Sequence, residues 1–89
     1  MIEEDQQLLE FPCEFPIKIM GETTETFKMT IREIVRRHAP DTPESSFRHV
    51  ESRTGKYVSI TATITAESRE QLDNLYRDIT ACELVKWAL

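Results

Sequence analysis

Hydrophobic and polar residues alternate most regularly between positions 56 and 65. One side of this segment is apolar, and the other side carries mainly hydroxyl groups. The apolar positions are Val58, Ile60, Ala62 and Ile64, and the polar ones are Tyr57, Ser59, Thr61, Thr63 and Thr65. A two-residue period rich in β-branched side chains is typical of a strand with one buried face. The segment therefore predicts a strand around which the other elements pack.

Weaker forms of the same alternation predict three more strands, at 15–21, 46–53 and 83–89. The first of these ends at Gly21, where the chain must turn into a helix. The second is highly charged, which suits an edge strand, and Thr54-Gly55 would join it to the next strand by a two-residue turn. In the last, the alternation places Val85, Trp87 and Leu89 on one face.

Two segments carry apolar residues at helical spacing. The stripe of the first helix consists of Phe27, Ile31, Ile34, Val35 and His38, and that of the second of Leu72, Leu75, Tyr76 and Ile79. Thr23 or Thr24 is placed to cap the first helix, and Pro40 ends it. Ser68 and Gln71 form a capping box at the start of the second helix.

The predicted elements follow the order β-α-β-β-α-β. Right-handed crossover connections then place both helices on one face of a four-stranded antiparallel sheet. This is the ferredoxin-like split βαβ arrangement, an α+β fold. The strand at 56–65 is central in this sheet, and its polar side faces away from the helices.

The charge of the chain is distributed unevenly. The formal net charge is −5, and residues 1–14 contain five acidic residues and no basic one. The other 11 acidic residues are matched by 11 basic residues, so residues 15–89 are neutral. We therefore predict an acidic, partly flexible N-terminal segment at 1–14 and one domain at 15–89. A neutral domain with an acidic segment does not attract nucleic acid.

The N-terminal residues and the cysteines indicate a compartment. Acidic residues stand where a signal peptide would need basic ones, and no apolar run reaches the roughly 20 residues that cross a bilayer. Two cysteines, Cys13 and Cys82, are too few for a disulfide framework. We therefore expect a cytoplasmic protein with reduced thiols and no membrane partner.

Cysteine and histidine are also the candidate groups for catalysis or metal binding. Cys13, Cys82, His38 and His49 are far apart, with no Cys-x-x-Cys or His-x-x-x-His pair. Cys13 lies between two prolines, and the sequence places no base beside it. We expect His38, at the helix end, to face the following loop. We therefore predict no metal, no cofactor and no enzymatic activity.

Several separated motifs resemble one family. They are Phe11-Pro12 with Phe15, Lys18-Ile19-Met20-Gly21, Arg37-His38-Ala39-Pro40, Ser52-x-x-Gly55-x-Tyr57, Ala66-x-Ser68-x-x-Gln71 and Leu75-Tyr76. Over residues 9–89 the chain thereby resembles the YbeD-like family of small bacterial proteins. The resemblance implies a ferredoxin-like fold close to the ACT regulatory domain. It also implies a function described only as that of a proposed lipoate-binding regulatory protein, and it supplies no catalytic residues.

The connection between the first strand and the first helix is a candidate ligand site, formed by Met20, Gly21, Glu22 and Thr23. Free amides at a helix N-terminus bind carboxylates, and ACT-like domains use the matching turn for small effectors. The alternative is that Gly21 only permits the turn. Glu22 would also oppose an anion.

The first helix carries a basic face, formed by Lys28, Arg32, Arg36 and Arg37. It is either an anion or nucleic-acid site or a solvated face on which Glu33 pairs with Arg37. An RNA-binding sheet of this topology would carry aromatic side chains in the middle of its open face. Hydroxyl groups occupy those positions here, so RNA binding is the third choice.

We therefore predict a non-enzymatic ACT-like module that binds a small ligand or regulates another protein, with a small carboxylate such as lipoate as candidate effector. We expect it to form a homodimer through an edge strand or through the polar side of the central strand, at Tyr57, Ser59, Thr61 and Thr63. The alternative is an adaptor that docks on a larger partner protein by its acidic N-terminal segment or its basic helix face.

Overall fold

A computed structural model describes residues 10–89 of the chain. Its elements are β1 (Cys13–Glu22), α2 (Glu25–His38), the short 3-10 helix η1 (Glu44–Ser46), β2 (Phe47–Glu51), β3 (Tyr57–Ala66), α3 (Arg69–Ala81) and β4 (Val85–Ala88). Strands and helices follow the predicted order. Residues 1–9 of the predicted acidic segment lie outside the described part.

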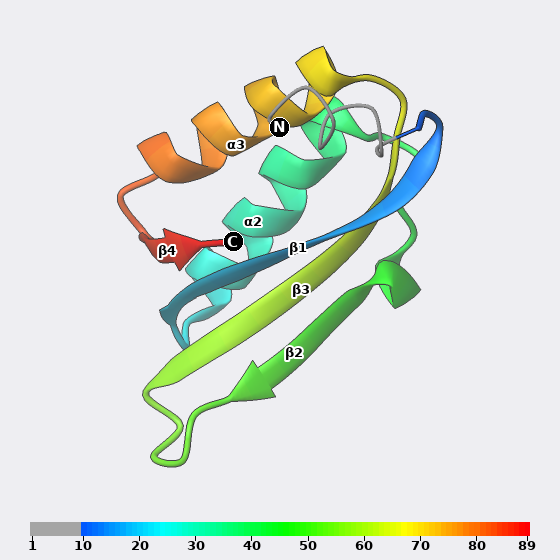
Figure 1. Cartoon of the computed structure of the whole chain (residues 1–89). Helices are drawn as coiled ribbons and strands as arrows, with labels where there is room; N and C mark the ends of the chain where they lie inside the picture. The colour runs from blue at the N-terminus through cyan, green and yellow to red at the C-terminus, as the bar shows by residue number, and fades with distance from the viewer. Residues whose placement is uncertain (1–9) are drawn as a thin grey trace, which may run out of the picture.

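The four strands form one antiparallel sheet in the order β2-β3-β1-β4. Both helices lie on the same face of this sheet (Figure 1). β3 pairs with β1 over its whole length on one side and with β2 on the other. The predicted ferredoxin-like α+β fold is confirmed, and so is the central place of β3.

The core lies between the sheet and the two helices. Its largest fully buried side chains are Phe27, Ile17, Ile19, Ile31, Ile60, Ile64, Leu75, Ile79, Val35 and Val58. Thr24 caps α2, because its hydroxyl accepts the Phe27 amide at 3.0 Å. Ser68 caps α3 in the same way, accepting the Gln71 amide at 3.1 Å. Each cap contributes about 1 kcal/mol.

Gly21 has a different role from the predicted one. It lies within β1, paired with Val58 and Val85, and Gly55 is the one glycine of the described chain with a positive φ. A Cβ atom at Gly21 would lie 2.6 Å from Cζ of Phe27 and 2.7 Å from the carbonyl oxygen of Leu84. Glycine is needed here because a ring and a backbone group fill the space, not because the chain turns.

The hairpin loop between β2 and β3 is longer than predicted. The Ser52 amide donates to the Tyr57 carbonyl at 2.8 Å, and the Gly55 amide donates to the Ser52 carbonyl at 2.9 Å. Residues 53–56 therefore form a four-residue loop, in which Gly55 has a φ of +79°. The predicted two-residue turn at Thr54-Gly55 is wrong, because the last paired residues before the loop are Ser52 and Tyr57 and not residues 53 and 56.

A β-bulge changes the face that β4 presents. The register between β1 and β4 shifts between Met20 and Gly21, so that Gly21 pairs with Val85 while Met20 pairs with Trp87. Val85 consequently packs against the core, whereas Trp87 is 41% exposed. The predicted common face of Val85, Trp87 and Leu89 is therefore wrong.

β1 also begins earlier than the predicted strand. Cys13 is its first residue, is half-buried against the core and pairs with Ala66. The predicted boundary between residues 14 and 15 thus falls inside a strand. Cys13 belongs to the ordered sheet and not to a segment that precedes it.

Candidate functional site

The sheet face that points away from the helices carries three of the five large hydrophobic side chains that are exposed in the described chain, Val50, Trp87 and Leu89. We call it the open face. Its outward positions follow from the strand register and are Glu14, Pro16, Lys18, Met20, Glu22, Arg48, Val50, Tyr57, Ser59, Thr61, Thr63, Thr65, Trp87 and Leu89. Leu89 belongs to this set because its amide and carbonyl both bond to Lys18, at 2.8 and 3.1 Å.

Four of these side chains form one row across all four strands. Val50 on β2 pairs with Ser59 on β3, Ser59 pairs with Met20 on β1, and Met20 pairs with Trp87 on β4. We call this the central row. Directly paired residues on neighbouring strands share a face and contact one another. Three apolar side chains and one hydroxyl therefore lie side by side, and neither helix covers them.

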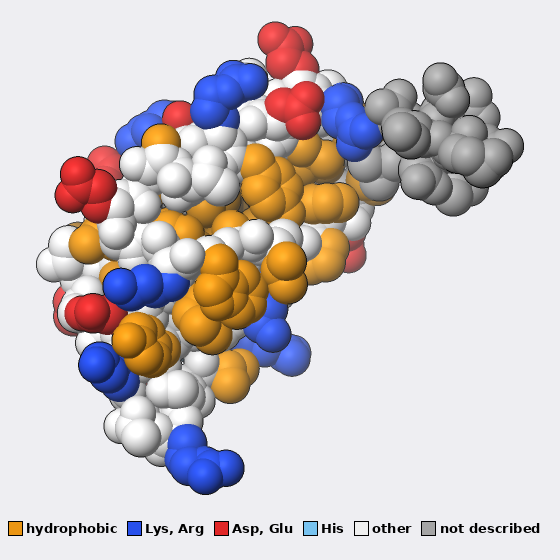
Figure 2. Space-filling model, turned by 60° about the vertical axis from the view of Figure 1, so that its left-hand side comes forward, with side chains coloured by type: hydrophobic (Ala, Val, Ile, Leu, Met, Phe, Trp, Pro, Cys, Tyr) orange, Lys and Arg blue, Asp and Glu red, His pale blue; other side chains and the backbone are white. Residues whose placement is uncertain are grey.

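Three apolar side chains of the open face are well exposed, and Met20 between them is half-buried. Val50 is 59% exposed, Trp87 41% and Leu89 70%. Figure 2 shows hydrophobic side chains gathered on the surface in the middle of the molecule, with Lys and Arg side chains beside them. Aromatic, Met and Arg side chains are enriched in protein interfaces. This composition is therefore typical of a docking surface.

Ser59 is buried although it belongs to the open face. It is only 6% exposed, and within residues 10–89 its hydroxyl has no hydrogen-bond partner. Its strand neighbours on both sides, Met20 and Val50, carry larger side chains. The hydroxyl is thus already removed from water before anything binds to the sheet.

Charged residues flank the central row in a regular order. On β1, Lys18 lies two residues before Met20 and Glu22 two residues after it, and all three point outward. Arg48 lies two residues before Val50 on β2. The open face therefore has cations along one side of its apolar row and a carboxylate on the other.

The residues predicted for self-association, Tyr57, Ser59, Thr61 and Thr63, lie together on the open face. The alternation within β3 does not indicate their apolar neighbours, which come from the other strands. Met20 and Val50 could have been found by aligning the predicted strands in register. Trp87 could not, because its exposure depends on the bulge.

Three arginines of the predicted basic face of α2 bind acidic residues of the same domain. Arg32 Nε donates to Glu44 Oε2 at 2.7 Å, and Arg36 Nη2 donates to Glu44 Oε1 at 3.4 Å. Both guanidinium groups lie over the buried Phe47 ring, 5.2 and 5.1 Å from its centroid. Arg32 and Arg36 therefore fasten η1 and β2 to α2.

Arg32 also contacts His49 on β2. Its Nη2 lies 3.1 Å from His49 Nε2, so that the guanidinium donates and a neutral imidazole accepts. Partial desolvation of the imidazole, and then the charge of Arg32, lowers the pKa of His49 below its ordinary value of 6.5. The arrangement therefore favours neutral His49.

Arg37 and His38 contact α3 through one shared carboxylate. His38 Nε2 lies 2.6 Å and Arg37 Nη1 3.6 Å from Asp78 Oδ2. His38 therefore faces α3. The prediction that it faces the following loop is wrong. The predicted Glu33–Arg37 ion pair does not form among the described side chains, because Asp78 is the acidic partner that Arg37 approaches.

The predicted ligand site at Met20, Gly21, Glu22 and Thr23 lies at the end of β1. The Thr23 amide is already used, since it donates to the Lys56 carbonyl at 2.9 Å, and the next amide, that of Thr24, donates to the Glu22 carbonyl at 2.9 Å. The Phe27 ring fills the space beside Gly21. A carboxylate site at these residues stays a prediction.

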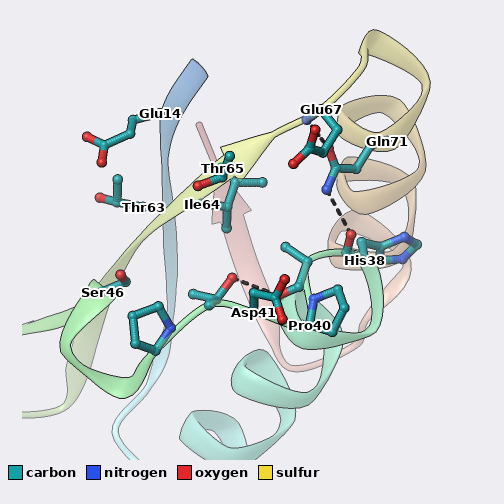
Figure 3. Close-up of a pocket in the computed structure, with 13 residues that line it drawn as sticks. Glu14, His38, Pro40, Asp41, Ser46, Thr63, Ile64, Thr65, Glu67 and Gln71 are labelled. Atoms are coloured by element: carbon teal, nitrogen blue, oxygen red, sulfur yellow. Dashed lines mark hydrogen bonds between the residues drawn. The ribbon is translucent and has the colours of Figure 1, made fainter. Parts of the chain in front are cut away.

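A pocket of about 480 Å³ lies elsewhere, between the end of α2, the far end of β3 and the start of α3. Figure 3 shows carboxylates from three segments around it, those of Glu14, Asp41 and Glu67. Gln71 closes one side, donating to the His38 carbonyl at 2.8 Å and accepting the Glu67 amide at 2.5 Å. Such a rim suits a cationic ligand and repels a carboxylate.

Both cysteines are free and half-buried, Cys13 in β1 and Cys82 at the end of α3. Within residues 10–89, no three His, Cys, Asp or Glu side chains gather closely enough to hold a metal ion. In the same part of the chain, no helix has both the length and the apolar character needed to span a membrane.

The chain is similar to known bacterial proteins over its whole length. It is 49% identical to a UPF0250 protein of Chromobacterium violaceum over 100% of both chains. It is 44% identical to a UPF0250 protein of Neisseria gonorrhoeae, covering 98% of this chain and 96% of the relative.

The fold is shared with a solved structure. The solution structure of protein HP0495 from H. pylori superposes with a TM-score of 0.71 at 17% identity, covering 91% of this chain and 85% of that one. The sequence profile of a family described as "Protein of unknown function (DUF493)" matches residues 6–89. The chain therefore belongs to the DUF493 family, which confirms the predicted relationship to small bacterial YbeD-like proteins.

Proposed function

We propose that this domain is a non-catalytic interaction module and that the open face of the sheet is its binding surface. The observation that supports this proposal is the central row. Val50, Met20 and Trp87, with Ser59 between the first two, form a largely apolar strip that the helices leave uncovered. Covering such a strip removes apolar surface from water and stabilises a complex.

The rest of the described surface offers less to a partner. The arginines predicted as an adaptor face are held by Glu44 and Asp78, so binding through them would first have to break these contacts. RNA binding stays the third choice, because the middle of the open face has Met20 and Ser59 where stacking would need aromatic rings. The open face also carries the carboxylates of Glu14 and Glu22.

Site-specific photo-crosslinking tests the proposed surface. A photoreactive amino acid replaces Thr61 on the open face or, as the matched control, exposed Asp73 on α3. After irradiation in bacterial cells, we expect defined protein adducts from position 61 and none from position 73. Adducts from neither position, or equally from both, would contradict the proposal.

A second candidate function is small-molecule binding in a regulatory role, supported by the pocket shown in Figure 3. Its carboxylate rim favours a ligand that carries an ammonium or guanidinium group. Lipoate and other simple carboxylates are poorer candidates for this pocket. If they bind to this domain, the predicted site at Gly21 is the other candidate.

A thermal-shift screen distinguishes these ligands, because a bound ligand raises the melting temperature by mass action. We expect stabilisation by primary amines and diamines and none by lipoate. Asp41→Asn should reduce the effect of the amines, while Glu33→Gln, on the exposed side of α2, should not. Stabilisation by lipoate alone would instead support the carboxylate site.

A further inference from the structure

We infer that the partner of the open face is a second copy of this chain, related by a two-fold axis that runs along the central row and crosses β1 at Met20. This inference rests on the proposed interaction function and names its partner. The two sheets then pack face to face with their strands nearly aligned, the ordinary arrangement of a β-sandwich.

The charges on β1 favour this axis. Lys18 and Glu22 lie on opposite sides of Met20, each about 7 Å away along the strand at about 3.3 Å per residue. A two-fold axis across the strands at Met20 reverses the strand direction of the second copy. Glu22 of each copy then faces Lys18 of the other, so that two opposite-charge pairs form.

The apolar residues of the open face fit the same axis. Because the axis runs along the central row, this row faces itself in the second copy. Trp87 meets Trp87, Met20 meets Met20 and Val50 meets Val50, while Arg48 faces Ser52 of the second copy, at the start of the hairpin loop that also carries Arg53 and Lys56. Apolar groups thus cover apolar groups, and on β1 each charge meets an opposite one.

Ser59 removes one cost of covering the sheet. Its hydroxyl is already shielded from water in the single chain. Burying a hydroxyl that is still hydrated would cost on the order of 1–3 kcal/mol in a protein. That cost does not arise again at Ser59 when a second sheet covers it.

An axis parallel to the strands is less favourable. Placed between β1 and β3, it would set Lys18 opposite Thr61 and Glu22 opposite Tyr57 of the second copy, following the observed pairing. Both charges would then lie without an opposite partner inside the contact. The charge pattern therefore selects the axis that crosses the strands.

A charge-reversal cycle followed by sedimentation equilibrium tests the inference. We expect a monomer–dimer equilibrium in the wild-type chain, weakened about tenfold or more by Lys18→Glu alone or Glu22→Lys alone, because each reversal sets like charges opposite each other twice. The double variant, with both charges exchanged, should return to within about threefold of the wild-type dissociation constant. The control pair is Arg69→Glu and Glu70→Lys on α3, which should leave dimerisation unchanged.

Three results would overturn the inference: a monomer at every concentration, a dimer insensitive to the single reversals, or no recovery in the double variant. Circular-dichroism melting curves verify that each variant folds. A monomer whose position-61 probe still captures a different protein in cells would overturn the second-copy partner and leave the interaction function standing. Absence of adducts from position 61 would instead overturn the interaction function itself.

Discussion

The ring of Phe27, in the first turn of α2, occupies the space in which a Cβ atom of Gly21 would lie. This contact joins the end of β1 to the helix that follows it, and the Leu84 carbonyl closes the same space from the other side. The end of β1 is therefore packed against its neighbours, and a side chain at Gly21 has no room.

Gly21→Ala should destabilise the domain by about 1–3 kcal/mol, the usual cost of overpacking. Chemical denaturation measures this difference. Combining it with Phe27→Leu should cost less than the sum of the two single changes, because the smaller side chain makes room. Gly55→Ala is a useful comparison, since a Cβ there would make only an ordinary contact with Glu51, at 3.8 Å, and the positive φ alone opposes the new side chain, at about 1–2 kcal/mol. Additive effects of Gly21→Ala and Phe27→Leu would contradict the proposed contact.

Arg36→Ala should lower the free energy of unfolding by about 1 kcal/mol, because the side chain covers the Phe47 ring and also binds Glu44. Phe47→Ala should cost about 3 kcal/mol or more, since this ring is only 7% exposed. Lys28→Ala, on the same helix, is the control and should have little effect. Urea unfolding of the three variants provides the comparison, and an Arg36→Ala protein as stable as wild type would refute the fastening role.

Two carboxylates should make the stability sensitive to acid. The hydrogen bond from Arg32 holds the pKa of Glu44 below its ordinary value of 4.5, and the hydrogen bond from His38 holds that of Asp78 below 3.8. In both cases the unfolded chain binds the proton at higher pH than the folded one. The stabilisation is therefore complete above the ordinary pKa and is lost as the pH falls through the folded-state pKa.

Replacing both groups, with Glu44→Gln and Asp78→Asn, should lower stability near neutral pH and flatten its decline below about pH 4.5. Melting temperatures between pH 3 and pH 7 measure this profile. Glu33→Gln is the control, because no ion pair of this exposed residue forms within the described chain. If the melting temperature of the double variant fell as steeply with decreasing pH as that of the wild type, the ion pairs of Glu44 and Asp78 would not explain the sensitivity to acid.

His49 should titrate below the ordinary histidine value of 6.5, since partial burial and Arg32 both disfavour its charged form. The unfolded chain then binds more protons than the folded one as the pH falls below 6.5, so His49 reduces stability in that window. An NMR titration of the imidazole measures the pKa directly. Arg32→Gln should raise this pKa, and an unchanged value would show that the guanidinium does not act on the ring.

Much of the fold was predictable because the buried side chains repeat at short, regular intervals. The alternation around Ile60 and the helical spacing of Ile31 and Leu75 depend on which residues face the core, and the structure buries all three. Caps at Thr24 and Ser68 were also predictable, since each acts within one turn of its own helix.

The remaining features depend on residues that are distant in sequence. Trp87 is exposed because of a register shift against β1, and the partners of Arg32 and Arg37 come from η1 and α3. Gly21 is required by packing against Phe27 and Leu84, which no local turn signal indicates. Such relationships arise only when the sheet and the helices are assembled.

In the proposed dimer, the open face joins two copies of this chain around Met20. Isotope-filtered NOE spectroscopy on a mixture of labelled and unlabelled chains tests it most directly. We predict intermolecular contacts of the Met20 methyl group with Met20 and Trp87 of the other copy, and contacts between Lys18 and Glu22. Intermolecular contacts confined to the helices or to the β2 edge, or none at near-millimolar concentration, would contradict it.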